Sequence, residues 1–344
     1  MHEAMLYERL PNDRVQCRVC QYRCKLSPGK RGVCRVRENR GGVLYTRVYG
    51  EISSVAVDPV EKKPLFHFYP GSKVFSLSTW GCNFRCVHCQ NEEISFADPE
   101  TGALLRGQRT LAPADAVRLA QENGCQGICW TYNEPTIWFE YTYDCARLAK
   151  ERGLYTAYVT NGFITEEALD TIGPYLDAWR VDIKGFSKDF YRRLARVADF
   201  QGILDMAVRA KEKWGMHVET VTNVIPGWND DDAQLRGVAE WTAQHLGPLT
   251  PWHVTRFYPH AELSGVSRTP LATLERAVRF GREAELKFVY LGNVPGHEDE
   301  STHCYNCGHL SIERWGYQVQ LKEITAGGTC ANCGADLNVR GVTK

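Results

Sequence analysis

Residues 80–91 read Trp-Gly-Cys-Asn-Phe-Arg-Cys-Val-His-Cys-Gln-Asn and place three cysteines, Cys82, Cys86 and Cys89, in one short loop. Thiolates are the preferred ligands of iron–sulfur clusters, and three of them at these spacings fit three corners of a cubane. No fourth cysteine follows nearby in the sequence, which leaves one iron open. Zinc bound by these thiolates and His88 is the alternative, but ligands at adjacent positions strain a tetrahedral site. The loop therefore predicts a [4Fe–4S] cluster.

The loop follows the first of several short apolar runs, each ending at polar, glycine or proline residues. Such runs predict strands, and amphipathic helical stripes such as Leu235, Val238 and Ala239 lie between them. This alternation predicts an α/β fold with parallel strands and right-handed crossovers, whose functional residues gather at the carboxyl ends of the strands. Periodicity alone does not separate a barrel from an open sheet. The expected strands are Val74–Ser78, Gly127–Thr131, Leu154–Thr160, Ala178–Ile183, His217–Val224, Trp252–Phe257 and Lys287–Leu291.

Five of these strands end in polar segments. Among their side chains, Glu134 is an acidic hydrogen-bond acceptor and Lys184 is a cation. Asp182 and Asn161 are further polar side chains at strand ends. Each segment alone is weak evidence, since Thr-Asn-Gly is more often a turn, and Glu134 before Pro135 also suits the first turn of a helix. The segments are Thr131–Pro135, Thr160–Gly162, Asp182–Lys184, Val224–Asp230 and Arg256–Pro259.

The Cys-x3-Cys-x2-Cys spacing, with the ring of His88 before the last cysteine, resembles the radical S-adenosylmethionine (SAM) superfamily, and the ordered strand-end segments reinforce this resemblance. The resemblance implies a partial (βα)6 barrel that binds one [4Fe–4S] cluster and SAM. It implies that Glu134, or backbone carbonyls near it, accept from the SAM ammonium group, that Lys184 pairs with the SAM carboxylate, and that Asp182 and Asn161 bind the ribose hydroxyls. No catalytic side chain is assigned. The residues expected at the cofactor are Asn133, Glu134, Asn161, Asp182, Lys184 and His88, beside the cluster ligands Cys82, Cys86 and Cys89.

A second group of cysteines forms two Cys-x2-Cys-Gly pairs near the C-terminus, at Cys304, Cys307, Cys330 and Cys333. The glycine after each pair lets backbone amides turn toward the thiolates. The range 316–323 alternates like a short strand between the pairs. The pattern predicts a structural zinc ribbon, with rubredoxin-like iron as the alternative metal.

A third group lies at the N-terminus, where Cys17, Cys20, Cys24 and Cys34 follow one another without paired Cys-x2-Cys knuckles. Four thiolates in so short a span predict one metal centre. Zinc and a second iron–sulfur cluster both suit them, and the spacing does not separate the two. A second cluster would relay electrons or bind substrate, whereas zinc would fold the segment.

Composition narrows the class of protein. The 344 residues include 41 Lys and Arg against 41 Asp and Glu, so net charge indicates no polyanionic partner. Residues 8–40 carry ten basic and three acidic side chains, for which we favour a solvated face around a metal site over a docking surface. Fourteen cysteines without a signal peptide or an apolar span indicate a cytoplasmic metal-binding protein, since disulfides are disfavoured there.

The three zones of the sequence predict three parts: a four-cysteine segment over 1–72, the SAM-binding barrel over 73–293 and the ribbon module over 294–344. This whole-chain arrangement resembles the radical SAM member of the AmmeMemoRadiSam system, which is related to pyruvate formate-lyase activating enzymes. That resemblance implies association with Memo-type and AMMECR-type proteins. The extra cysteines outside the barrel differ from the activases and put glycyl-radical activation in doubt.

These observations predict an enzyme that cleaves SAM reductively and abstracts hydrogen from a substrate by way of a 5′-deoxyadenosyl radical, with flavodoxin or ferredoxin as electron donor. The substrate is either a polypeptide, as for the activases, or a small molecule. A non-enzymatic iron–sulfur or zinc protein for electron transfer or nucleic-acid binding is the third alternative. The strand-end segments argue against it, because an electron carrier needs no SAM pocket.

Overall fold

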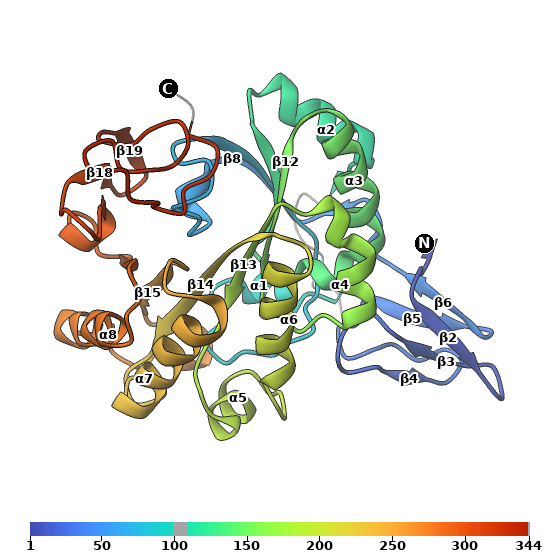
Figure 1. The fold of residues 1–344 in the computed structure, drawn as a ribbon. Coiled ribbons are helices and arrows are strands. Elements are labelled where there is room, and N and C mark those ends of the chain that lie inside the picture. The colour runs from blue at the N-terminus through green and yellow to red at the C-terminus, as the bar shows by residue number, and fades with distance from the viewer. Residues whose placement is uncertain (99–108, 343–344) are drawn as a thin grey trace.

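An eight-stranded sheet forms the centre of the computed structural model, which describes residues 1–98 and 109–342 (Figure 1). Its order is β16-β15-β14-β13-β12-β11-β9-β8, with parallel pairing from β9 to β16 and antiparallel pairing of β8 with β9. Because β8 and β16 are its two ends, the sheet is open. The strands are β8 (Ser54–Pro59), β9 (Lys73–Ser78), β11 (Gly127–Trp130), β12 (Tyr155–Thr160), β13 (Ala178–Asp182), β14 (His217–Val224), β15 (Trp252–Arg256) and β16 (Val289–Gly292).

The seven parallel strands confirm the seven predicted from apolar runs, each to within two residues at either end. They read as apolar runs because helices on one face and interior side chains on the other bury them from both sides. All four residues of β11 and all eight of β14 except Asn223 are buried. The carboxyl ends of these strands therefore share one edge of the sheet.

Helices connect the strands and cover the outer face of the sheet (Figure 1). Three of them begin at side chains that accept a backbone N–H bond: Thr165, Ser187 and Asp231 cap α4, α5 and α7. The helices are α1 (Glu92–Ser95), α2 (Pro113–Glu122), α3 (Phe139–Glu151), α4 (Glu166–Ile172), α5 (Lys188–Leu194), α6 (Gln201–Glu212), α7 (Asp232–Trp241) and α8 (Leu271–Glu283). Short turns of 3₁₀ or π type lie at η1 (Val60–Lys62), η3 (Pro135–Trp138), η4 (Gly173–Tyr175), η5 (Thr242–Leu246), η6 (Ala261–Leu263) and η7 (Glu298–Glu300).

Small antiparallel sheets flank the central one. At the N-terminal end, β1-β6-β5 and β2-β3-β4 make two of them, and β7 pairs with β10. Their strands are β1 (His2–Glu3), β2 (Tyr7–Leu10), β3 (Arg14–Cys17), β4 (Lys25–Leu26), β5 (Arg37–Arg40), β6 (Val43–Thr46), β7 (Glu51–Ile52) and β10 (Arg109–Thr110). Strand β8 belongs to the central sheet although it lies within the range 1–72 that we assigned to the N-terminal segment. The three domain boundaries stay a prediction.

The C-terminal module contains β17 (Thr302–His303), β18 (Leu310–Trp315) and β19 (Gln318–Leu321), and Figure 1 places it beside β8. The alternation over 316–323 corresponds to β19, with Gly316 in the turn before it. A buried network joins the module to the sheet: the His67 ring lies 2.7 Å from the Leu337 carbonyl oxygen and 2.6 Å from Tyr290 Oη. Over the described ranges, no helix has the length and apolarity to span a membrane.

Candidate active site

The loop that carries Cys82, Cys86 and Cys89 leaves the carboxyl end of β9. Gly81 precedes it with φ +88°, and a Cβ built there would lie 2.5 Å from Val36 Cγ1, so only glycine fits. The Phe84 amide donates to Cys82 Sγ over 3.4 Å. Burial raises the pKa of Cys86 to about 12, opposed by the Lys184 ammonium. A bound metal would favour the thiolate over the thiol.

Asn133, at the end of β11, ties its own strand to the cysteine loop. Its Nδ2 donates to the carbonyl oxygens of Thr79, over 3.0 Å, and of Gly81, over 2.8 Å. Asn91, just beyond the last cysteine, donates to the Tyr132 carbonyl oxygen over 2.7 Å. Two amide side chains thus hold both ends of the loop against the end of β11.

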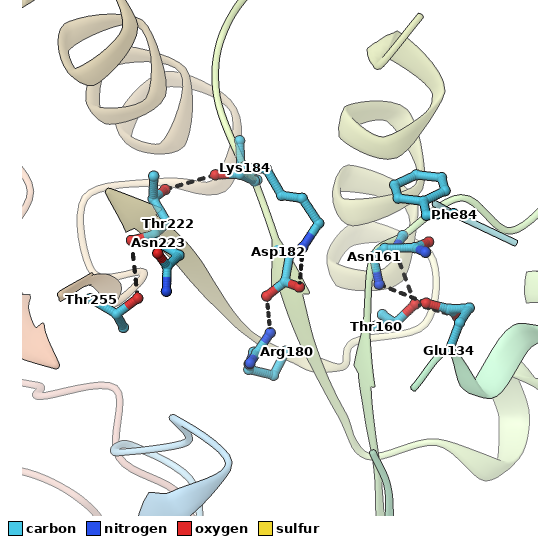
Figure 2. Close-up of polar contacts among 12 residues, drawn as sticks. Phe84, Glu134, Thr160, Asn161, Arg180, Asp182, Lys184, Thr222, Asn223 and Thr255 are labelled. Carbon is cyan, nitrogen blue, oxygen red and sulfur yellow. Dashed lines mark hydrogen bonds and ion pairs between the residues drawn. The ribbon is translucent and has the colours of Figure 1, made fainter. Parts of the chain in front are cut away.

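Glu134 is buried and accepts three hydrogen bonds from the protein itself. The donors are the Thr136 amide at 2.9 Å, Thr160 Oγ1 at 2.7 Å and the Asn161 amide at 2.7 Å. Figure 2 shows Glu134 with Thr160 and Asn161. Burial raises the pKa of Glu134 above the ordinary glutamate value, although these donors oppose the rise. This arrangement fits the helix-start alternative for Glu134, because Thr136 belongs to the turn η3. It also places Asn161, whose Nδ2 donates to Asn83 Oδ1 over 2.7 Å.

At the end of β13, Asp182 lies between two cations (Figure 2). Lys184 Nζ is 2.7 Å from Asp182 Oδ2, and Arg180 Nη1 pairs with Oδ1. Although burial opposes it, the charges of Arg180 and Lys184 lower the pKa of Asp182 to about 2. Two cations and one anion leave this trio with a net charge of +1. Asn229 Nδ2 donates to the Lys184 carbonyl oxygen over 2.7 Å, which brings the segment after β14 to the same place.

His88 is buried in the cysteine loop. Burial, reinforced by the Lys184 ammonium, lowers the pKa of its ring to about 3, so the ring is neutral at physiological pH. Its Nδ1 has no hydrogen-bond partner within the described part of the chain. The ring is therefore a buried polar group that a ligand can satisfy.

Three more buried polar atoms near this edge have no partner among the described residues: Thr79 Oγ1, Asn83 Nδ2 and Asn223 Oδ1. Thr79 and Asn83 flank Cys82 on the cysteine loop, and Asn223 lies at the end of β14 (Figure 2). Unsatisfied buried polar groups are rare unless a ligand or water completes them. The residues present therefore fit a polar ligand beside the three thiols. Sequence reasoning missed these residues because an isolated Thr or Asn has no distinguishing pattern.

The polar strand-end segments do not all converge on the cysteine loop. Asn133, Glu134, Asn161, Asp182, Lys184 and His88 lie around the cysteine loop, as their contacts and mutual electrostatic effects show. Tyr258, after β15, is instead 40% exposed, and its hydroxyl donates to the Asn293 carbonyl oxygen over 3.3 Å. Cys129 and Cys145 lie apart from the three cysteine sets and are fully buried.

The C-terminal cysteines form a compact tetrad. Cys304 Sγ lies 3.5 Å from Cys333 Sγ, and Cys307 Sγ lies 3.7 Å from Cys330 Sγ. All four sulfur atoms are within 4.8 Å of one another. Tetrahedral zinc with Zn–S bonds of about 2.3 Å requires sulfur separations of about 3.8 Å. The tetrad can therefore hold a single metal ion.

The N-terminal cysteines line one buried cavity, together with Arg37 and Ile137. Gly32 lies against it, and a Cβ built there would be 3.7 Å from both Cys24 Sγ and Cys34 Sγ. Arg37 is 2% exposed and forms a two-pronged ion pair with Glu140, at 3.0 and 2.8 Å. The four predicted ligands, Cys17, Cys20, Cys24 and Cys34, thus lie around a common space.

Comparison with known proteins matches residues 77–236 to the radical SAM superfamily. The chain is 41% identical to an uncharacterized protein of Methanocaldococcus jannaschii over 340 residues, which cover 98% of this chain and 99% of the relative. It is 23% identical to pyruvate formate-lyase 1-activating enzyme of Escherichia coli, over 50% of this chain and 71% of that enzyme. A radical SAM methyltransferase structure from Sphaerobacter thermophilus aligns with 71% of each chain at 19% identity and a TM-score of 0.49.

These findings confirm the predicted superfamily and the relationship to the activating enzymes. They do not test the AmmeMemoRadiSam resemblance, which stays a prediction. The roles of the individual site residues also stay predictions, and we treat them below as proposals.

Proposed function

The chain belongs to the radical SAM superfamily, and from this premise we propose that Cys82, Cys86 and Cys89 bind a [4Fe–4S] cluster at which SAM is cleaved reductively. When bound, the cluster supplies one electron to SAM, so that the C5′–S bond breaks and a 5′-deoxyadenosyl radical abstracts hydrogen from the substrate. The observation that carries this proposal is the convergence of polar strand ends on the cysteine loop. Asn133 and Asn161 bond directly to residues of that loop or next to it.

The protein residues bind and orient. In the proposed site, the trio of Arg180, Asp182 and Lys184 offers a net charge of +1 to the SAM carboxylate. The neutral His88 ring and the unsatisfied Asn83 amide offer one polar atom each. Glu134 acts as a positioning residue, since its oxygens already accept bonds from three protein donors.

The substrate is a separate proposal with two forms. A polypeptide substrate is supported by the relatives named as activating enzymes of pyruvate formate-lyase and isethionate sulfite-lyase, at 23–27% identity. A small-molecule substrate is the second form, because the cysteine sets outside the barrel distinguish this chain from the activases. Memo-type and AMMECR-type proteins are proposed partners on the subfamily resemblance alone, and flavodoxin or ferredoxin is the proposed one-electron donor.

The C-terminal tetrad is the proposed zinc site. Its two measured sulfur separations, 3.5 and 3.7 Å, suit one tetrahedral ion. The small module around it shares a hydrophobic cluster with Phe66 and Tyr290, so the ion would stabilise the module rather than take part in the reaction.

The test is 5′-deoxyadenosine formation by anaerobically reconstituted protein given dithionite and SAM. We expect product from the wild type, and none from the variant that combines C82A, C86A and C89A. C145S is the matched control, because Cys145 is a buried cysteine on α3 whose thiol donates to the Pro113 carbonyl oxygen. Product formation by the triple variant would contradict the proposal.

A further inference from the structure

We propose that Cys17, Cys20, Cys24 and Cys34 bind a second [4Fe–4S] cluster, which passes electrons to the cluster at Cys82, Cys86 and Cys89. The electron-relay role rests on the proposed function. The identity of the metal centre does not, because it follows from the geometry of the cysteines.

The spacing of the sulfur atoms separates a cluster from a single ion. In a cubane each thiolate binds a different iron, so its four sulfur ligands are roughly 6 Å apart, against about 3.8 Å around one zinc. The C-terminal tetrad has the short spacing. Within residues 1–98 and 109–342, no other three potential ligands from His, Cys, Asp and Glu lie within 4.8 Å of one another. The N-terminal cysteines therefore share one cavity but are spaced more widely than the C-terminal tetrad, which favours a cluster over a single ion.

The lining of this cavity supports the same conclusion. Arg37 reaches it with a guanidinium group that is 2% exposed and whose Nε has no partner in the described part of the chain. Its other two nitrogens bind Glu140. An unsatisfied buried N–H beside four cysteines is suited to donate to a sulfur of a bound cluster. Gly32 leaves this wall without a side chain, and a Cβ built there would lie 3.7 Å from two of the sulfur atoms.

Four cysteine ligands leave every iron of a cubane coordinated by protein. Such a cluster has no open site for a substrate, in contrast to the cluster predicted at Cys82, Cys86 and Cys89. Its remaining chemistry is electron transfer. This excludes the substrate-binding role that the sequence left open for a second cluster.

The two cysteine sets lie next to each other in the fold. Gly81, directly before Cys82, packs on the segment after Cys34: a Cβ at Gly81 would lie 3.0 Å from the Cys34 carbonyl oxygen. Aromatic rings also connect the sets. Tyr22 lies between Cys20 and Cys24 in sequence, and its ring centroid is 5.1 Å from that of Phe163.

Phe163 in turn lies 5.3 Å from the ring of Phe84, which follows Cys82 by two residues. Close packing of this kind gives an electron a short path without solvent. In the relay, a low-potential flavodoxin or ferredoxin gives one electron to the N-terminal cluster, reducing it from 2+ to 1+. The same electron then passes to the second cluster, and the N-terminal cluster returns to 2+ with no atom or proton transferred.

The first test is the metal content of the wild-type protein after anaerobic reconstitution, with electron paramagnetic resonance of the reduced state. We expect about eight irons per chain and two cluster signals, together with one zinc. The triple variant at Cys82, Cys86 and Cys89 should keep about four irons and one signal. A wild type with about four irons and two zinc ions, or a triple variant without iron, would overturn the proposal. A wild type that binds about eight irons but does not cleave SAM would instead refute the proposed function, while the assignment of a cluster to the N-terminal cysteines would stand.

The second test separates the relay from a structural role. The double variant C20S and C24S should lose about four irons yet still form 5′-deoxyadenosine with dithionite, a small reductant that reaches the second cluster directly. With reduced flavodoxin, its rate should fall at least about tenfold below the wild type, which corresponds to about 1.4 kcal/mol in the barrier. If the rate of 5′-deoxyadenosine formation falls equally with dithionite and with reduced flavodoxin, the relay is contradicted. The double variant C330S and C333S is the matched control. Its ratio of the flavodoxin-driven rate to the dithionite-driven rate should equal that of the wild type.

Discussion

Replacing Glu134 with glutamine tests whether this carboxylate holds the site together. One oxygen accepts from the Thr136 amide and Thr160 Oγ1, and the other accepts from the Asn161 amide. A glutamine has one oxygen and one NH2 group. In either orientation its NH2 faces a backbone N–H, so one buried amide loses its acceptor.

The magnitude follows from these contacts. An unsatisfied buried N–H costs about 1–3 kcal/mol, and the bonds lost are to a charged acceptor. Loss of the buried charge offsets part of this cost, since burial already raises the pKa of Glu134. We expect a net local destabilisation of about 2 kcal/mol. This corresponds to roughly 30-fold faster amide exchange in a segment that opens locally.

The assay is hydrogen exchange by mass spectrometry on peptides that contain Thr136 and Asn161, beside iron content and SAM affinity. We expect faster exchange in both peptides, unchanged iron and weaker SAM binding. Glu283 is the control, because its pair with Arg236 is 2.7 Å long and the Glu283 side chain is 54% exposed, so E283Q should change little. Unchanged exchange combined with weaker SAM binding would refute the reasoning, since Glu134 would then be a direct ligand.

Three further perturbations have defined outcomes. G81A should lower the free energy of unfolding by about 3 kcal/mol, because the added Cβ clashes with Val36 and the backbone keeps a positive φ. G124A is the control: Gly124 has φ +67° but no atom within 4 Å of the added Cβ, so this variant should lose about 1 kcal/mol. Denaturant unfolding measures both values. Burial lowers the pKa of His67 to about 3 in the folded protein, against 6.5 in the unfolded chain. The folded state is therefore most stable above pH 6.5, and its free energy of unfolding decreases as the pH falls below that value. Between pH 7.5 and 5.5 this should remove about 1.4 kcal/mol, and H67Q should flatten that part of the pH profile. A zinc chelator should make residues 294–344 the first site of proteolysis while iron content stays constant; simultaneous loss of iron would contradict a separate ribbon.

The central sheet was predictable because its strands are buried on both faces and read as apolar runs. The position of β8 was not, since its pairing with β9 is a contact that no local pattern encodes. Asp58 near its end is buried and accepts from Lys63 Nζ and Tyr132 Oη, at 2.7 and 2.6 Å. Such a cluster needs three segments to meet, which periodicity cannot show.

The site was predictable where motifs repeat at successive strand ends and unpredictable where single polar residues complete it. The segments around Glu134 and Asn161 were found because each closes an apolar run. Whether Glu134 faces a ligand or its own backbone depends on the turn after β11, and the structure gives it three protein donors. Asn83 and Asn223 became candidates only through their unsatisfied atoms.

The trio at the end of β13 has the charges that the proposed SAM site needs both with and without a bound carboxylate. Asp182 accepts from Arg180 and Lys184 at once, so the two cations share one carboxylate and the trio keeps a net charge of +1. If Lys184 turns to the carboxylate of the proposed SAM ligand, Arg180 still neutralises Asp182, and every charge of the trio has a partner. With a single cation, binding would have to break the only ion pair of Asp182. The second cation therefore lowers the free-energy cost of exchanging partners, as reversible binding at the proposed SAM site would require.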